Sequence, residues 1–265
     1  MAEAISQWRK RIKSITRDCT VDYLSSEFCF RDPIRPIKNN SGIIYSPADG
    51  IVIDVSKVDS VDQLIYTKMG NVCLSSLCHG MIENGNYTCV SIFLTFYDPH
   101  IVRMPFDGVV SRKDLPPYYV LDHPMLDFEN TIINGRISEI DRREIGTFAF
   151  NQRSLFEIFS PMIGRKLFLL LTADYDIDTI VSFFTGNNRP LKPGTNPGSC
   201  FLIDTIVSFF TGNNRPLKQN QRIGQIRYGS MATLIIPSDI KFSPCVRELV
   251  HVEAGIDPIF MSDEK

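Results

Sequence analysis

Gly229 and Ser230 form the pair of residues in this chain with the most distinctive potential chemistry. They lie between two apolar, β-like runs in the segment 223–237. A serine hydroxyl placed here can attack the carbonyl carbon of the preceding residue, and glycine leaves that carbon uncrowded. β-Elimination of the resulting ester breaks the chain, and hydrolysis of the remaining enamine leaves a pyruvoyl group at position 230. The pair therefore suggests a chain that makes its own electrophile, although most Gly-Ser pairs only form turns.

This reaction needs a base, because a serine hydroxyl is a weak nucleophile until its proton is removed. His100, in the segment 93–108, follows a strongly alternating run, which predicts a loop or a short helix at a sheet edge. Its side chain titrates near neutral pH, as proton transfer requires. Asp49 could orient the imidazole as in a Ser-His-Asp triad. Each residue also has a simpler interpretation: His100 as an ordinary loop histidine, and Asp49 as part of a Pro-Ala-Asp-Gly turn.

Amino-acid composition limits which partners, compartment and metal sites we expect for this chain. The 265 residues include 28 Lys and Arg against 30 Asp and Glu, so net charge predicts no nucleic-acid partner. Seven scattered cysteines without a CxxC pair favour free thiols in a reducing, intracellular compartment. The histidines show no metal-ligand spacing, so we expect no metal. No apolar run approaches the roughly 20 residues that span a bilayer.

The pattern of apolar residues predicts a mainly β (α+β) fold, with a barrel-like or sandwich core and a few short helices. Short β-branched or alternating runs are separated by Gly, Pro, Asn and Asp. The expected strands cover 42–46, 50–56, 87–96, 109–110, 147–150, 155–158 and 166–172. A short helix is expected near 74–77, and another is expected to begin at 99–102.

Residues 3–19 form an expected amphipathic helix with basic outer faces. Its apolar positions follow helical spacing and include Ile5, Trp8 and Ile12. Such a helix can lie in a membrane interface, or it can dock on its own domain with a solvated basic side. We divide the chain into this basic helical segment, residues 1–26, and one catalytic domain, residues 27–265.

A 16-residue segment occurs twice without a difference, as 177–192 and as 203–218. The repeat indicates a tandem duplication or an artefact of sequence assembly. A solenoid needs at least three units. Each copy contains a strand-like run followed by a turn-rich tail, so either copy could occupy the same place in a sheet.

The ordered motifs of the chain resemble those of the phosphatidylserine decarboxylase family. Pro-Ala-Asp-Gly at 47–50, Asp-x-His-x-x-Arg-x-Pro at 98–105 and Gly-x-x-x-x-Gly-Ser at 224–230 occur in the family's order. Further segments agree: 27–37 resembles its Phe-Phe-x-Arg motif, 68–77 its Lys-Gly-x-x-Tyr-Ser-Leu segment, and 148–153 its Phe-Ala-x-Asn-Glu-Arg segment.

The resemblance implies a pyruvoyl-dependent, self-processing enzyme that converts phosphatidylserine to phosphatidylethanolamine and CO2 through a Schiff base. Ser230 would be the pyruvoyl precursor, cut from Gly229, with His100 and Asp49 assisting. The partners implied are a phospholipid and a membrane surface, reached peripherally through residues 3–19. A homodimer is left open as an assembly.

The chain departs from the common family pattern at two positions. Arg103 stands where many members have a second histidine, as in a short bacterial and archaeal branch that it resembles. An arginine fork suits phosphate or carboxylate, so Arg103 is a candidate substrate-binding residue. Met231 replaces the threonine that usually follows the serine.

Two other functions remain open from the sequence. One is the same chemistry on a free or aromatic amino acid, because the duplication alters the segment before Ser230. The other is an unprocessed, inactive relative that acts as a membrane-binding or scaffold protein. Cleavage between 229 and 230 discriminates the enzymes from the scaffold.

Overall fold

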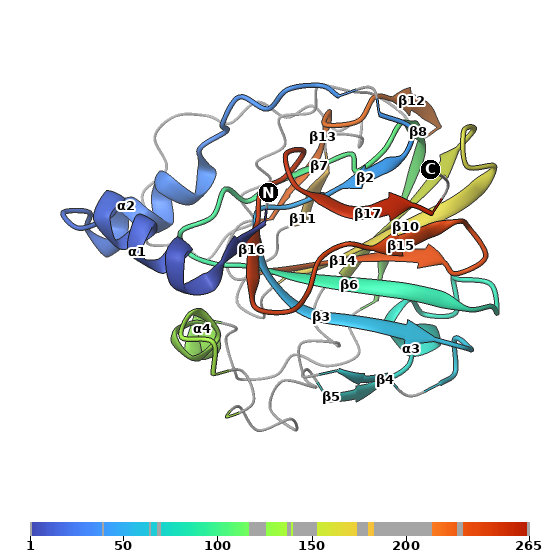
Figure 1. Ribbon diagram of the computed structural model, residues 1–265, viewed down its shortest axis with the longest axis horizontal. Helices are drawn as coiled ribbons and strands as arrows, with labels where there is room; N and C mark the ends of the chain where they lie inside the picture. Colours follow the sequence, from blue (N-terminus) through green and yellow to red (C-terminus); the bar gives the residue numbers. More distant parts are fainter. Residues whose placement is uncertain are drawn as a thin grey trace.

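The computed structural model describes residues 2–38, 40–63, 65–67, 70–116, 126–136, 139, 153–173, 180–182, 214–226 and 230–263. Most of the ordered elements are strands, which confirms the mainly β prediction (Figure 1). Within these described ranges the sheets do not close into a barrel, and they form a sandwich-like core.

The largest sheet has nine antiparallel strands in the order β1-β16-β3-β6-β14-β10-β9-β8-β12. Their bounds, in the same order, are Glu3–Ala4, Val250–Val252, Gly50–Val58, Tyr87–Leu94, Ser230–Pro237, Arg165–Thr172, Arg153–Ser160, Gly108–Leu115 and Arg215–Leu217. Six long strands, β3, β6, β14, β10, β9 and β8, form its continuous centre.

Three smaller sheets complete the β structure. One contains β11, β13 and β7 (Ile180–Ser182, Arg222–Ile226, Ile101–Arg103), and the second contains β15, β17 and β2 (Phe242–Pro244, Pro258–Ser262, Ile43–Tyr45). The third is the hairpin of β4 and β5 (Ile65–Thr67, Gly70–Val72). The helical elements are α1 Ile5–Ile15, α2 Val21–Ser26, the 3₁₀ turn η1 Phe28–Phe30, α3 Leu74–Leu77 and α4 Leu126–Ile133.

The main core lies between the large sheet and the first two small sheets. Val52, Ile92 and Leu234 of the large sheet belong to one buried cluster with Val102 of β7 and Phe260 of β17. This packing explains the alternation seen in the sequence, because one side of each central strand faces this layer.

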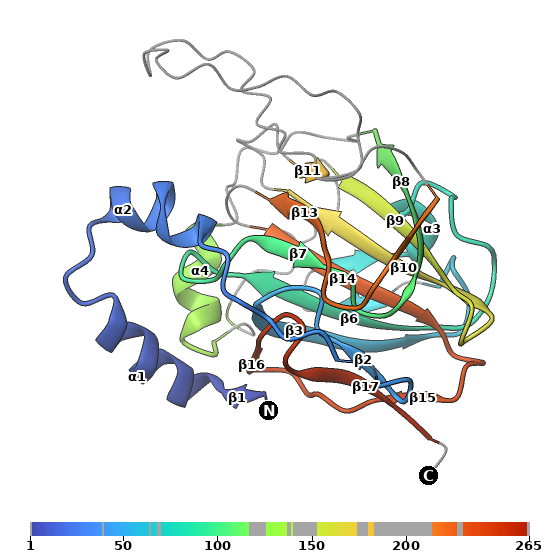
Figure 2. The ribbon, with the colours of Figure 1, turned by 90° about the horizontal axis from the view of Figure 1, so that it is seen from above.

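The opposite face of the large sheet is covered by helices. Near one end of the strands, Trp8 and Ile12 of α1 pack with Phe93 and Met231. Figure 2 shows α1, α2 and α4 grouped at that end of the central strands. Trp8 is 1% exposed, so in this structure the apolar face of the N-terminal helix docks on its own domain.

The prediction of a short helix beginning at 99–102 is wrong, because Ile101–Arg103 form strand β7. Its β-branched residues Ile101 and Val102 pair with β13. The strand expected at 147–150 lies outside the described residues.

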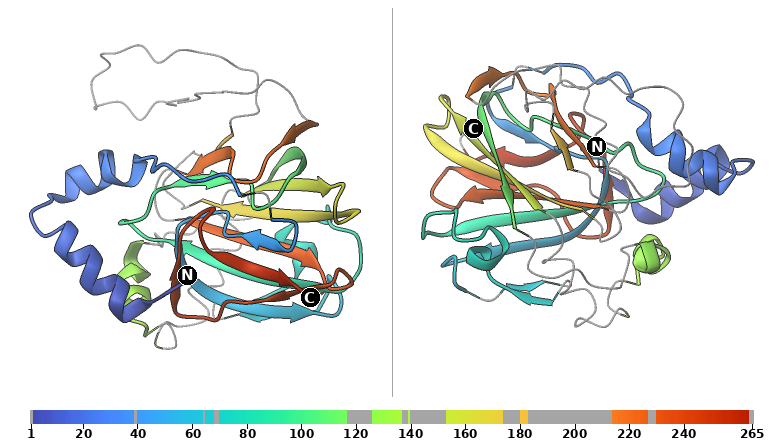
Figure 3. Two further views of the ribbon diagram at one scale, coloured as in Figure 1. Left: turned by 45° about the horizontal axis from the view of Figure 1, so that its top comes forward. Right: turned by 180° about the vertical axis from the view of Figure 1, so that it is seen from behind.

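The two copies of the repeat contribute different elements where they are described. The first copy supplies β11, which pairs with β13, whereas the second supplies β12 from its tail, which pairs with β8. Figure 3 shows β12 beside β8 at the edge of the large sheet. Apart from Asn214 and Lys218, which flank β12, the rest of both copies lies outside the described residues.

Candidate active site

The predicted site segments leave the large sheet at one end of three neighbouring strands. Ser230 begins β14 and pairs with Leu94, the last residue of β6. Gly50 begins β3, and the following residue, Ile51, pairs with Phe93 of β6. The antiparallel register therefore brings Ser230, the turn before β3 and the loop after β6 together at one end of these three strands.

The loop after β6 fixes the position of His100. The backbone N–H of His100 donates to the carbonyl of Cys29 (2.8 Å), and its carbonyl accepts from the N–H of Ile226 (3.0 Å). The imidazole is 1% exposed, and its Nδ1 lies 2.8 Å from the carbonyl oxygen of Asp98. Since a carbonyl only accepts, Nδ1 carries the proton and Nε2 keeps its lone pair.

The Nε2 atom of His100 is buried and has no hydrogen-bond partner within the described part of the chain. Burial, reinforced by Arg31, lowers the pKa of His100 below its ordinary value, against the opposing influence of Asp98. A neutral imidazole with a free Nε2 is a competent proton acceptor at neutral pH. The structure thus leaves on His100 the atom that a general base requires.

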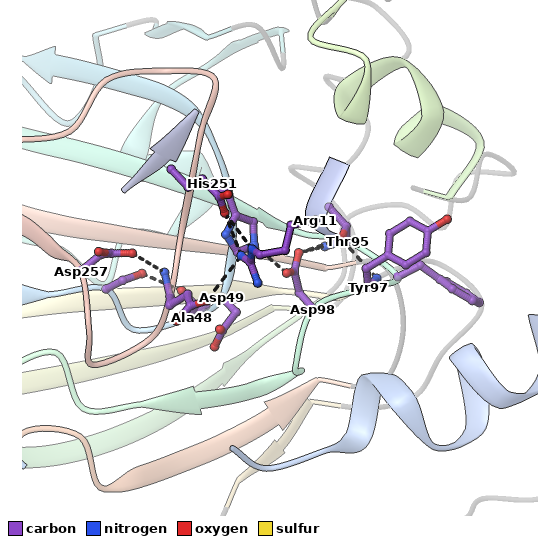
Figure 4. Close-up of polar contacts among 12 residues, drawn as sticks. Arg11, Ala48, Asp49, Thr95, Tyr97, Asp98, His251 and Asp257 are labelled. Atoms are coloured by element: carbon purple, nitrogen blue, oxygen red, sulfur yellow. Dashed lines mark hydrogen bonds and ion pairs between the residues drawn. The ribbon is translucent and has the colours of Figure 1, made fainter. Parts of the chain in front are cut away.

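Asp98 holds this loop through its carboxylate. Its Oδ2 accepts from the hydroxyl (2.7 Å) and the backbone N–H (3.0 Å) of Thr95, and its Oδ1 lies 2.7 Å from Nε2 of His251. Figure 4 shows His251 and Asp98 turned toward each other beside Thr95. Burial opposes ionisation of Asp98, but His251 and the bonds from Thr95 lower its pKa overall.

His251 reaches Asp98 from the C-terminal strand β16, which pairs with β3. Its ring is 3% exposed and stacks on Trp8 with centroids 4.8 Å apart and an interplanar angle of 14°. Burial alone would lower its pKa, but the charge and hydrogen bond of Asp98, with smaller contributions from Asp49 and Glu253, raise it. The two side chains therefore form a buried ion pair.

Asp49 lies in the same region but has a different partner from the one predicted. It forms a buried ion pair with Arg35, which also donates to Glu253 at 2.8 Å. No hydrogen bond joins Asp49 to His100 among the described contacts; the Asp98 carbonyl orients that ring instead. Burial, only partly offset by Arg35, raises the pKa of Asp49 to about 7. A catalytic role for Asp49 stays a prediction.

Arg103, the candidate substrate-binding residue, is buried and contacts the protein on both terminal nitrogens. It pairs with Asp32, which also pairs with Arg222, and donates to the carbonyls of Asn220 (3.0 Å) and Pro33 (3.2 Å). Binding of a substrate anion would compete with these partners. Its predicted role likewise stays a prediction.

Residues 27–37, singled out by their motif, hold the His100 loop from outside the sheet. Arg31 donates to the carbonyls of Phe28 (2.6 Å) and Tyr97 (2.7 Å), and its guanidinium lies 3.8 Å from the centroid of the Phe28 ring. With the bond from His100 to Cys29, this segment fastens the loop at two points.

The predicted cleavage site adjoins this loop through the chain itself. Ile226 is bonded to His100, and Ser230, four residues later, is paired with Leu94. Four residues span at most about 14 Å, so the backbone of Ser230 cannot lie far from that of Ile226. Gly229 lies outside the described residues.

Sequence reasoning missed the contributions of Asp98 and His251. Asp98 belongs to the Asp-x-His motif at 98–100, so the sequence placed it close to His100. Nothing in the sequence indicated that its side chain binds His251. His251 gave no local signal, because Val-His-Val reads as an ordinary strand. Only the pairing of β16 with β3 brings it to the site.

A cavity of about 300 Å³ adjoins β16 and is lined by Glu3, Arg11, His251, Glu253, Ile256 and Asp257. Within the described ranges, no three His, Cys, Asp or Glu side chains are grouped as metal ligands.

Comparison with known proteins finds the phosphatidylserine decarboxylase family, whose model matches residues 28–259. A phosphatidylserine decarboxylase proenzyme of Wolbachia pipientis is 33% identical over 94 residues, which is 36% of this chain and 34% of that protein. The namesake of Ehrlichia chaffeensis is 29% identical over 100 residues, covering 37% and 35%. That of Prosthecochloris aestuarii is 26% identical over 154 residues, covering 58% of each.

The chain thus spans about a third of the length of the first two of these relatives in the matched region. No solved structure gives a significant match.

Proposed function

This chain belongs to the phosphatidylserine decarboxylase family, and we propose that it is a self-processing decarboxylase acting on phosphatidylserine to give phosphatidylethanolamine and CO2. The observation that carries the proposal is the buried, unpartnered Nε2 of His100 in the loop that follows the strand paired with Ser230. The substrate is proposed from the names of the relatives.

The first reaction proposed is processing at Ser230. His100 Nε2 accepts the hydroxyl proton while Oγ attacks the carbonyl carbon of Gly229, and the peptide bond becomes an ester. β-Elimination breaks the ester and leaves Gly229 with a carboxylate. Hydrolysis of the remaining enamine consumes one water, releases one ammonia and leaves the pyruvoyl group.

The pyruvoyl group supplies a ketone that takes up a substrate amine and draws electrons so that a carboxylate can leave. The residues present fit such a group, because the lone pair on His100 Nε2 is buried, and nothing among the described residues uses it. In decarboxylation we assign His100 the same atom, as the place where a proton is held and delivered. Asp98 keeps Nε2 available by retaining the proton on Nδ1.

We also propose an intracellular protein that attaches peripherally to a membrane. Trp8 is buried, so attachment would use other residues of the N-terminal segment. Ile15, Val21 and Tyr23 are 55%, 70% and 42% exposed, and exposed basic residues accompany them: Lys10, Lys13 and Arg17. Apolar side chains with basic neighbours suit an anionic lipid surface.

No helix in the described ranges is long and apolar enough to cross a membrane. Among the described residues no disulfide joins the cysteines Cys19, Cys29, Cys73, Cys78, Cys89 and Cys245.

The proposed activity can be tested by release of CO2 from phosphatidylserine in vesicles and, separately, from free serine. We expect release from the lipid, abolished when borohydride is added together with the substrate and absent in Ser230→Ala. Release from free serine alone would favour the amino-acid enzyme. An uncut chain that binds anionic vesicles without releasing CO2 would favour the scaffold.

A further inference from the structure

His251 is a buried, charged side chain to which the proposed reaction gives no task. It lies on β16, three strands from β14, which begins at Ser230. Neighbouring strands are about 4.8 Å apart, so about 14 Å separates the two strands. His251 is therefore too remote to act directly on Ser230, and any influence on the reaction must pass through another group.

Asp98 is the group through which His251 can act. The two oxygens of the Asp98 carboxylate have separate partners: Thr95 binds Oδ2, and His251 binds Oδ1. The same residue offers its backbone carbonyl to His100 Nδ1. A displacement of Asp98 thus changes the one contact that sets the tautomer and the orientation of His100.

Local contacts make this linkage stiff. The backbone N–H of Asp98 donates to the carbonyl of Thr95 at 2.9 Å, so residues 95–98 form a closed turn. Thr95 and His251 form hydrogen bonds with different oxygens of the Asp98 carboxylate. Stacking on Trp8 fixes the plane of the His251 ring. The side chains of Trp8, His251 and Asp98 are all nearly fully buried.

We infer that His251 is a positioning residue of the processing reaction: through its bond to Asp98 it keeps the proton of His100 on Nδ1 and leaves Nε2 free. The inference rests on the proposed function of His100. It goes beyond the predicted site, because His251 contacts neither Ser230 nor His100 in any of the bonds described. A backbone carbonyl relays no proton, so the role is one of orientation.

Two substitutions separate the hydrogen bond from the packing. His251→Gln retains an N–H donor close to the position of Nε2, whereas His251→Phe retains an aromatic ring against Trp8 and removes the donor. We expect the Gln variant to process within a few-fold of wild type. We expect the Phe variant to process about ten- to a hundred-fold more slowly, as small misplacements of catalytic groups do.

The pH profile gives a readout that packing alone would not change. Loss of His251 removes a cation that lowers the pKa of Asp98, so in His251→Phe this pKa rises and processing acquires a new loss on its acid side. Other charged groups facing this region are Arg11 on α1, Arg31 after η1, Asp49 before β3, Glu129 on α4, and Glu253 beyond β16; they remain in both variants.

A second measurement does not depend on processing. In full-length Ser230→Ala with ¹⁵N-labelled histidines, the ring nitrogens of His100 should report Nδ1–H, and adding His251→Phe should mix in the Nε2–H tautomer. Thr95→Val, which removes the other side-chain bond to Asp98, should shift the same signals.

The outcomes are distinct. An unchanged His100 tautomer together with unchanged processing in His251→Phe would overturn the inference. So would equal slowing in the Gln and Phe variants with no new acid loss. If the Phe variant does not fold, the His100 tautomer is measured in Thr95→Val, where the signals should shift, and in His251→Gln, where they should stay as in wild type. Unchanged signals in Thr95→Val would then overturn the inference. A wild-type chain that never cleaves would contradict the proposed function, while the tautomer measurement would still test the inference.

Discussion

The backbone of Gly50 lies against the carbonyl of Phe93, so closely that a Cβ on residue 50 would meet the Phe93 oxygen and lie 2.9 Å from Cγ2 of Ile92. This contact lets β3 begin directly beside the end of β6. It gives a physical reason for glycine in Pro-Ala-Asp-Gly, where sequence alone indicated only a turn.

Gly50→Ala should therefore displace the start of β3 and destabilise the protein by about 1–3 kcal/mol, as overpacking does. Processing should slow as well, because Asp49 and the His100 loop lie at the same end of β3 and β6. Thermal unfolding and a processing time course measure both effects. Gly85→Ala is the matched control, since its Cβ would meet only the Tyr87 ring at ordinary contact distances of 3.7 Å and more; equal effects at both positions would contradict this account.

Replacement of His100 by Gln should slow processing by about a hundred-fold, the usual contribution of a positioned base. In wild type, the lowered pKa of His100 keeps Nε2 unprotonated to below the ordinary histidine range. The rate should stay level near neutral pH and fall as pH decreases through that lowered pKa. The exposed His79, substituted by Asn, provides the control. A His100→Gln chain that processes at the wild-type rate would remove His100 from the mechanism.

Sequence patterns predicted the fold class correctly, but they did not predict which contacts the candidate site residues make. The alternation of residue types in 87–96 predicts a strand with two different faces, and the structure has strand β6 there, at Tyr87–Leu94. The partner of the His100 ring could not be read in this way, because Pro-Ala-Asp-Gly suggested Asp49, whereas the ring is bonded to a backbone carbonyl two residues before it. Contacts made by strand register, such as that of His251, depend on pairing between segments far apart in the chain.

Glu129 offers a test of the electrostatics beneath the site. It is buried on α4 and accepts from the N–H of Phe96 at 2.7 Å, and burial raises its pKa to about 8. The folded state thus binds a proton that the unfolded state releases near pH 4.5. The stability of wild type should decline relative to Glu129→Gln as pH rises from about 4.5 to about 8, and the difference should level off above that.

The difference at pH 8 should be at least about 1 kcal/mol, or roughly 2–4 °C in the midpoint of thermal unfolding for a chain of this size. Thermal unfolding of both proteins across this pH range measures it. A constant difference at every pH would show that Glu129 ionises normally.

Attachment to anionic lipid should depend on the basic side of the N-terminal segment. Reversal of Lys10, Lys13 and Arg17 to Glu should weaken binding to phosphatidylserine vesicles by at least about a hundred-fold, at about 1 kcal/mol for each basic residue lost. Processing and thermal stability should be unchanged, because all three side chains are exposed.

The same three charge changes at exposed lysines elsewhere, Lys57, Lys113 and Lys241, form the control for this experiment. Equal loss of vesicle binding in both triple variants would show that net charge, and not this segment, determines binding.

The intact mass of the purified full-length protein tests the central claim most directly. Cleavage before Ser230 predicts two chains, of 229 residues and of 36 residues (265 − 229). The smaller chain should be lighter than a serine-ended one by the mass of one ammonia, and Ser230→Ala should give a single uncut chain. A wild-type protein that remains one chain of 265 residues would contradict the account.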